Sequence, residues 1–93
     1  MRIRWRALAE ADLHAIVDYI AQDNAIAALV LGDTVARRVA ELAERPKLYR
    51  AGRVRGTREM VVHPNYVVVY RIKRDEIEVV RVLHAAQHWP SVR

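Results

Sequence analysis

The stretch Arg53–Pro90, RVRGTREMVVHPNYVVVYRIKRDEIEVVRVLHAAQHWP, decides the fold of this chain. Valine-rich runs alternate with short polar or proline-containing breaks, a pattern typical of consecutive antiparallel strands joined by tight turns. The breaks are His63-Pro64-Asn65 and Arg74-Asp75-Glu76. We therefore predict a three-stranded meander, with strands over Thr57–Val62, Tyr66–Lys73 and Ile77–Leu83.

The residues before this stretch predict one short strand and two helices. Ile3 and Trp5 alternate with arginines, the period of a strand. Apolar residues then recur on one helical face over Ala9–Gln22 and again over Ala25–Glu44. Asn24 is a suitable N-cap for the second helix, and Pro46 stops it.

Two amphipathic helices need a sheet to cover, so the fold class predicted for the single domain 1–93 is α+β. The architecture has two layers, in which the N-terminal strand and a two-helix hairpin pack with an antiparallel sheet that contains the C-terminal meander. The long helical connection lets the first strand join an edge of that meander. Residues 85–93 form a short tail.

Composition limits the kinds of protein this chain can be. The chain has 93 residues, 53% of them hydrophobic, and no cysteine, which excludes disulfide and thiolate-metal sites. It has neither an apolar run long enough to span a membrane nor a signal peptide, so we expect a cytoplasmic domain. The net charge is +5: residues 1–46 carry six basic and seven acidic side chains, and residues 47–93 carry ten and four. Such a basic half suits a polyanionic partner.

A basic connection precedes the meander. It holds five cations within twelve residues and no acid: Lys47, Arg50, Arg53, Arg55 and Arg58. Arginine suits phosphate oxygens, and the nearby Tyr49 could stack on a base, although a solvated loop with a packed tyrosine is the plainer interpretation.

Arg71 and Arg81 lie inside otherwise apolar strands, where an unpaired charge would be costly. They either form cross-strand ion pairs, with Glu59, Glu76 or Glu78 as partners, or they line an open face that contacts a substrate or partner.

Histidines at strand ends are the candidate acid–base groups: His63, His84 and His88. The spacing of His84 and His88 would suit a metal only on a helix, which Pro90 prevents, so no metal and no cofactor is predicted. His14 is expected on the surface of the first helix. The chain contains no nucleophile elbow, Walker loop or other conventional catalytic motif.

The order of elements and several segments resemble the RelE/ParE superfamily of bacterial type II toxins. The segments are Ala9-Glu10-Ala11-Asp12-Leu13, Val54-Arg55-Gly56-Thr57-Arg58-Glu59, Tyr66–Arg71, and Val80–His84 leading to Trp89-Pro90. The resemblance covers essentially the whole chain. It implies a toxin neutralised by a cognate antitoxin encoded beside it, in a hetero-oligomer. The antitoxin would lay a helical or extended segment on the toxin, and Ile26, Leu29 and Val30 are its candidate contacts, with ordinary core packing as the alternative.

The resemblance leaves the molecular target open. ParE-like members bind and poison DNA gyrase, whereas RelE-like members are metal-independent endoribonucleases that cut mRNA on the ribosome. Where ribosome-dependent members carry lysines and an arginine on one strand, this chain has Glu59, Val61 and His63, which favours the ParE-like branch. A toxin with no remaining activity is a third possibility.

Each branch assigns roles to particular residues. If the chain is a nuclease, the resemblance implies a catalytic set of Glu59, Arg81 and His84 or His88. The candidate contacts to the target or to nucleic acid are Arg53, Arg55, Arg58 and Arg71.

Overall fold

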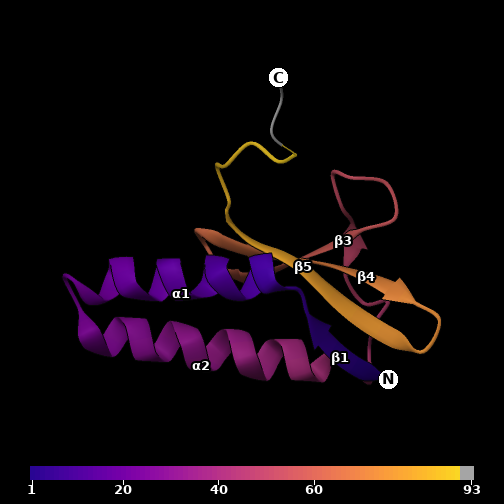
Figure 1. The fold of residues 1–93 in the computed structure, drawn as a ribbon, viewed down its shortest axis with the longest axis horizontal. Coiled ribbons are helices and arrows are strands. Elements are labelled where there is room, and N and C mark those ends of the chain that lie inside the picture. Colours follow the sequence, from indigo (N-terminus) through magenta and orange to yellow (C-terminus); the bar gives the residue numbers. More distant parts are fainter. Residues whose placement is uncertain (91–93) are drawn as a thin grey trace.

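The computed structural model describes residues 1–90, which form a helical hairpin packed on a five-stranded sheet (Figure 1). The predicted α+β class is confirmed. The elements in chain order are β1 (Arg2–Trp5), α1 (Ala7–Ala21), α2 (Ala25–Glu41), β2 (Arg50–Ala51), β3 (Arg58–His63), β4 (Tyr66–Lys73) and β5 (Glu76–His84). The last three residues of the expected tail lie outside the described part of the chain.

The sheet has the strand order β1-β5-β4-β3-β2. Strands β3, β4 and β5 form the predicted antiparallel meander. Strand β1 joins the free edge of β5, as expected, but runs parallel to it, so the sheet is mixed and not wholly antiparallel. A parallel neighbour is possible here because the chain between β1 and β5 is long and includes both helices.

The element boundaries differ from the predicted ones at a few ends. Helix α2 ends at Glu41, three residues before the predicted Glu44, and the chain turns ahead of Pro46. The short strand β2 was not predicted, because its two residues lie in a stretch that reads as a basic loop. It pairs with β3 at Glu59 and Arg58.

The main core lies between the helices and one face of the sheet. Strand β4 contributes Tyr66, Val68 and Tyr70 to it, and β1 contributes Ile3 and Trp5. The alternate residues of β4 point to the opposite face, which we call the outer face because no helix covers it. There Val69, Val80 and Leu83 form a second small cluster, and Trp89 of the tail packs against it.

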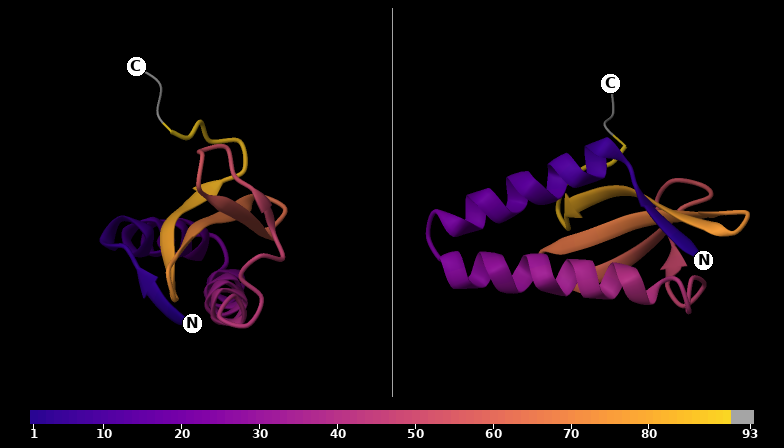
Figure 2. Two further views of the ribbon diagram at one scale, coloured as in Figure 1. Left: turned by 90° about the vertical axis from the view of Figure 1, so that its right-hand side faces the viewer. Right: turned by 60° about the horizontal axis from the view of Figure 1, so that its bottom comes forward.

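The helical hairpin extends past the end of the sheet (Figures 1 and 2). Asn24 caps α2 as predicted, since its side-chain oxygen accepts a hydrogen bond from the Ala27 N–H at 3.0 Å. The tip is strongly apolar: Ile26, Leu29 and Val30 are 74%, 72% and 59% exposed. The interpretation that these three residues belong to the core is therefore wrong. Neither helix of residues 1–90 is long and apolar enough to cross a membrane.

Candidate binding and ionic sites

A groove of about 630 Å³ lies between α1 and the ends of β4 and β5 where the helical hairpin leaves the sheet. Its wall on α1 includes Ile16 and the exposed Tyr19, and its sheet side includes Tyr66 and His84. The Tyr66 ring lies 5.5 Å from the His84 ring, edge to face, and 5.4 Å from the His63 ring. The groove therefore combines apolar and aromatic side chains with several polar groups, the mixture found in many ligand-binding clefts.

Arg81 forms an ion pair with Asp12, which lines this groove. The guanidinium donates to both carboxylate oxygens at 2.7 and 3.0 Å, and the Val82 N–H donates to one of them at 3.0 Å. The hydrogen bond to Asp12 raises the pKa of Arg81. The predicted pairing of Arg81 with an acid across the sheet is wrong. The Arg81 side chain reaches Asp12 on α1 instead, and it does so next to a register shift in β5.

Glu59 is buried on the outer face and is held by the basic connection. The backbone N–H and the Nε of Arg53 donate to the same carboxylate oxygen at 2.9 and 3.0 Å, and Arg50 lies 3.8 Å from the other oxygen. Burial acts to raise the pKa of Glu59, but the hydrogen bonds from Arg53 outweigh it, so the pKa lies below the ordinary value of 4.5. Arg53 also donates to the Gln87 carbonyl at 3.0 Å and so anchors the tail.

The two histidines of the proposed catalytic set are exposed and line different hollows. His84 is exposed at the end of β5, and its Nδ1 accepts a hydrogen bond from the Ala86 N–H at 3.1 Å. His88 is exposed in the tail and lines a shallow hollow with Arg53 and Trp89. The register places Glu59 and Arg81 in one row, both opposite Val69 of β4, but Arg81 is bound to Asp12 on α1 and Glu59 to Arg53.

The four arginines predicted to contact a target also have different surroundings. Arg58 donates to the carbonyls of Lys47 and Tyr49 at 3.3 and 2.7 Å, so it fixes the connection to β3. Arg55 is exposed at the tip of its loop. Arg71 lies opposite Glu78 on β5, and its Nε is 3.2 Å from a Glu78 oxygen without a well-directed hydrogen bond. The cross-strand partner predicted for Arg71 is confirmed.

Sequence reasoning missed a charged array on the outer face, which we call the cationic ladder. It consists of Arg2, Arg4, Arg6, Arg71 and Lys73, with Glu76 and Glu78 between them. The register forms two rows across three strands, Arg2–Glu76–Lys73 and Arg4–Glu78–Arg71. Arg4 donates to Glu76 at 2.9 Å and to Glu78 at 2.6 Å, and the hydrogen bond to Glu76 is the main reason that its pKa is raised.

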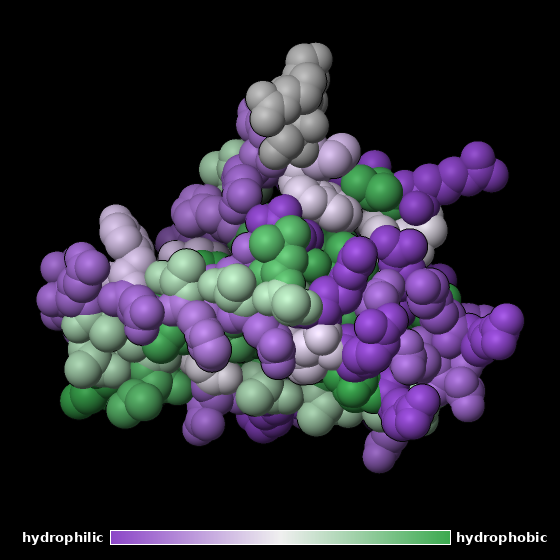
Figure 3. Space-filling view, viewed as in Figure 1, coloured by the Kyte–Doolittle hydropathy of each residue, from purple (hydrophilic) through white to green (hydrophobic). Residues whose placement is uncertain are grey.

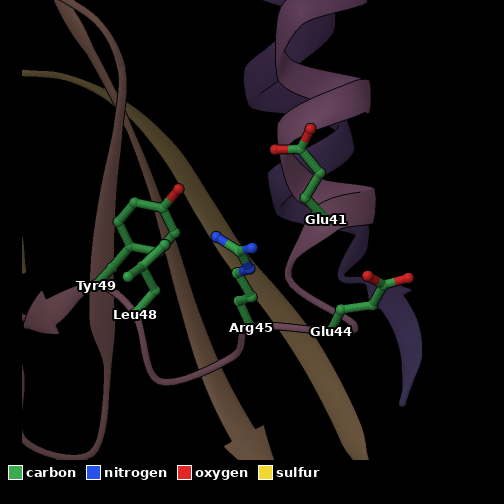
Figure 4. Close-up of a pocket in the computed structure, with 5 residues that line it drawn as sticks. All are labelled: Glu41, Glu44, Arg45, Leu48 and Tyr49. Carbon is green, nitrogen blue, oxygen red and sulfur yellow. The ribbon is translucent and has the colours of Figure 1, made fainter.

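A separate pocket of about 380 Å³ lies beyond the end of α2 (Figure 4). Arg45 extends between Tyr49 on one side and Glu41 and Glu44 on the other. The Tyr49 hydroxyl accepts a hydrogen bond from Arg38 at 3.2 Å, so this pocket is built around packing of the connection on α2. None of the residues that line it belongs to the predicted catalytic, target or antitoxin contacts.

A helical hairpin packed on a mixed five-stranded sheet is the fold of a class of small toxins. The family model of the ParE toxin of the type II toxin-antitoxin system parDE matches residues 3–89. The chain therefore belongs to the ParE toxin family.

Relatives in sequence and structure agree with this assignment. Y4kP of Sinorhizobium fredii is 41% identical over 98% of this chain and 95% of its own length. Toxin RelE2 of Caulobacter vibrioides is 42% identical over 89% of this chain and 91% of its own length. The chromosomal ParDE toxin–antitoxin system from P. aeruginosa contains a chain with a TM-score of 0.80 and 25% identity, over 90% of this chain and 95% of that one. A copper-bound mutant toxin from Helicobacter pylori shares the fold, with a TM-score of 0.68 and 15% identity, over 92% and 96% of the two chains.

Proposed function

We propose that this toxin arrests growth by binding DNA gyrase, in the manner of ParE-like proteins, and not by cutting RNA. The observation that carries the proposal is that Arg81 and Glu59, two of the candidate nuclease residues, are both held in structural ion pairs. General acid–base cleavage needs the base, the acid and the cation within hydrogen-bond reach of one phosphodiester. Here Asp12 engages Arg81 and Arg53 engages Glu59, so neither side chain is free to reach a phosphodiester. The family model and the similarity to the ParDE chain support the same conclusion.

Two assays on the purified toxin test this proposal against the alternative. We expect the toxin to inhibit DNA supercoiling by gyrase and to leave translation and mRNA intact. The variants His84→Ala and His88→Ala should arrest growth as the unchanged chain does, because neither side chain would act chemically. Cleavage of mRNA on ribosomes without any effect on supercoiling would overturn the proposal, and so would loss of toxicity in a His84→Ala chain that still folds.

We further infer that a cognate antitoxin neutralises the toxin by covering the apolar tip of the helical hairpin. The space-filling view shows hydrophobic residues at this tip, at the lower left of Figure 3. Ile26, Leu29 and Val30 occupy neighbouring positions on one side of α2, so one apolar segment of a partner can contact all three. Exposed apolar patches of this kind mark protein interfaces more often than they serve a free monomer.

A charge placed in the patch tests the antitoxin contact. Leu29→Asp should leave toxicity intact and abolish rescue by the antitoxin encoded in the neighbouring reading frame. Leu48→Asp is the matched control, because Leu48 is similarly exposed, at 60% against 72% for Leu29, and lies beyond the other end of α2. Equal rescue of both variants would exclude the tip as the antitoxin contact.

A further inference from the structure

The cationic ladder carries more positive charge than its own carboxylates neutralise. Its five cations surround two glutamates, and the more deeply buried of these, Glu78, lies within 4.0 Å of four of them. Glu78 is only 5% exposed, whereas Arg2, Arg4 and Arg6 are 87%, 53% and 50% exposed. The carboxylates therefore form the base of the array, and the cationic groups face solvent.

The two glutamates also orient the guanidinium groups. Arg4 is held by both carboxylates through hydrogen bonds, and Arg71 lies 3.2 Å from Glu78 of the neighbouring strand. Arg2, Arg4 and Arg6 follow the strand direction at every second residue, roughly 6.6 Å apart by strand geometry. Guanidinium groups in a row are well suited to the oxygens of successive phosphates, because each planar fork can donate two parallel hydrogen bonds.

The chemistry of the surface favours nucleic acid over an acidic protein. Protein interfaces have an apolar core, whereas interfaces with nucleic acid are polar and strongly basic. Of the large hydrophobic side chains that are exposed in residues 1–90, only Met1 and Leu8 lie near the ladder along the chain, Leu8 beside Arg6 at the start of α1. The others lie on the helices, in the basic connection and on β3. Figure 3 shows hydrophilic side chains gathered on the right, where Figure 1 draws β1 and the turn between β4 and β5.

We propose that the cationic ladder binds the phosphodiester backbone of nucleic acid. It lies on the outer face of the sheet, away from the helices, because Ile3, Trp5 and Ile77 alternate with its residues and pack in the main core. The contact is consequently separate from the apolar tip of the hairpin. It does not depend on whether gyrase is the target.

The salt dependence of binding to a labelled 20-base-pair DNA duplex, and to an RNA duplex of the same length, tests this proposal. The unchanged toxin should bind with a dissociation constant of roughly 10⁻⁴ to 10⁻⁶ M near physiological salt, the range of non-specific contacts. The double variant Arg2→Gln/Arg6→Gln removes two exposed charges of the ladder. Its slope of log K against log salt on the DNA duplex should be shallower by about 1.8, since each lost phosphate contact accounts for about 0.9.

The control is Arg37→Gln/Arg45→Gln, which changes the net charge equally but alters α2 and the turn that follows it. Its slope should match that of the unchanged toxin. Equal losses in the two double variants would show that only net charge matters and would overturn the proposal, as would an absence of binding by the unchanged toxin at 50 mM salt. Thermal unfolding of each variant verifies that it is folded, and the ratio of DNA to RNA affinity identifies the preferred nucleic acid.

Discussion

Asp12 joins helix α1 to the sheet through a single carboxylate that accepts three hydrogen bonds from β5. Two come from the Arg81 side chain and one from the backbone of the next residue. Both side chains are mostly buried, at 13% exposure for Asp12 and 19% for Arg81. The pair therefore serves the packing of the two layers, and a guanidinium so engaged is not free to contact a substrate.

Breaking this pair should destabilise the fold strongly. We expect Arg81→Met to cost about 3 kcal/mol, because it leaves a mostly buried carboxylate without its counter-ion. Asp12→Asn should cost a similar amount, and the double variant less than the sum of the two, since the residues are directly coupled. Urea unfolding of the four chains measures this coupling. Strictly additive losses would show that the two residues act independently.

Glu59 should make stability depend on pH in the acidic range. Its pKa in the folded chain lies below 4.5, so the unfolded chain takes up the proton first as the pH falls. The stabilisation by Glu59 is then complete above about pH 4.5 and is lost as the pH falls through the lower pKa of the folded chain. Glu59→Gln should be less stable at pH 7 and lose less stability on acidification. The exposed Glu44→Gln is the control, and a titration that is steeper for Glu59→Gln than for the unchanged chain would contradict this account.

At the scale of elements, two glycines have opposite roles. A Cβ at Gly32 in α2 would meet only Val17 Cγ2, at 3.8 Å, so Gly32→Ala should stabilise the helix by about 0.5–1 kcal/mol. A Cβ at Gly52 would collide with the Thr57 hydroxyl, which donates to the Val54 carbonyl at 2.6 Å and cannot easily move. Gly52→Ala should lower the melting temperature while Gly32→Ala raises it. Shifts in the same direction would refute this assignment.

The meander was predictable because its turns are short and its strands are strongly patterned. A two-residue turn at Arg74 and Asp75 sets the register that places Arg71 opposite Glu78, so this ion pair follows from the local sequence. The partner of Arg81 did not follow in the same way. Asp12 lies off the apolar stripe of its helix and 69 residues away, and no periodicity in the sequence connects the two.

Across the molecule as a whole, the charges of the two sequence halves do not reveal the cationic ladder, because its residues come from both halves. Residues 1–46 are nearly neutral in sum, but their arginines at positions 2, 4 and 6 lie on the sheet while most of their acids lie on the helices. The parallel pairing of β1 with β5 moves those arginines next to Arg71 and Lys73. A basic surface could be inferred from the sequence. Its location could not, because it depends on the pairing of β1 with β5.

The same pairing has a consequence for how the toxin comes into being. Within residues 1–90, β1 leaves the ribosome before both helices, and the strand with which it pairs, β5, follows all the other strands. Synthesis proceeds at roughly 5–20 residues per second, so the first strand waits for several seconds without its partner. A chain whose translation stops before β5 cannot close this sheet, so a cell meets the folded toxin domain only after that strand has been made.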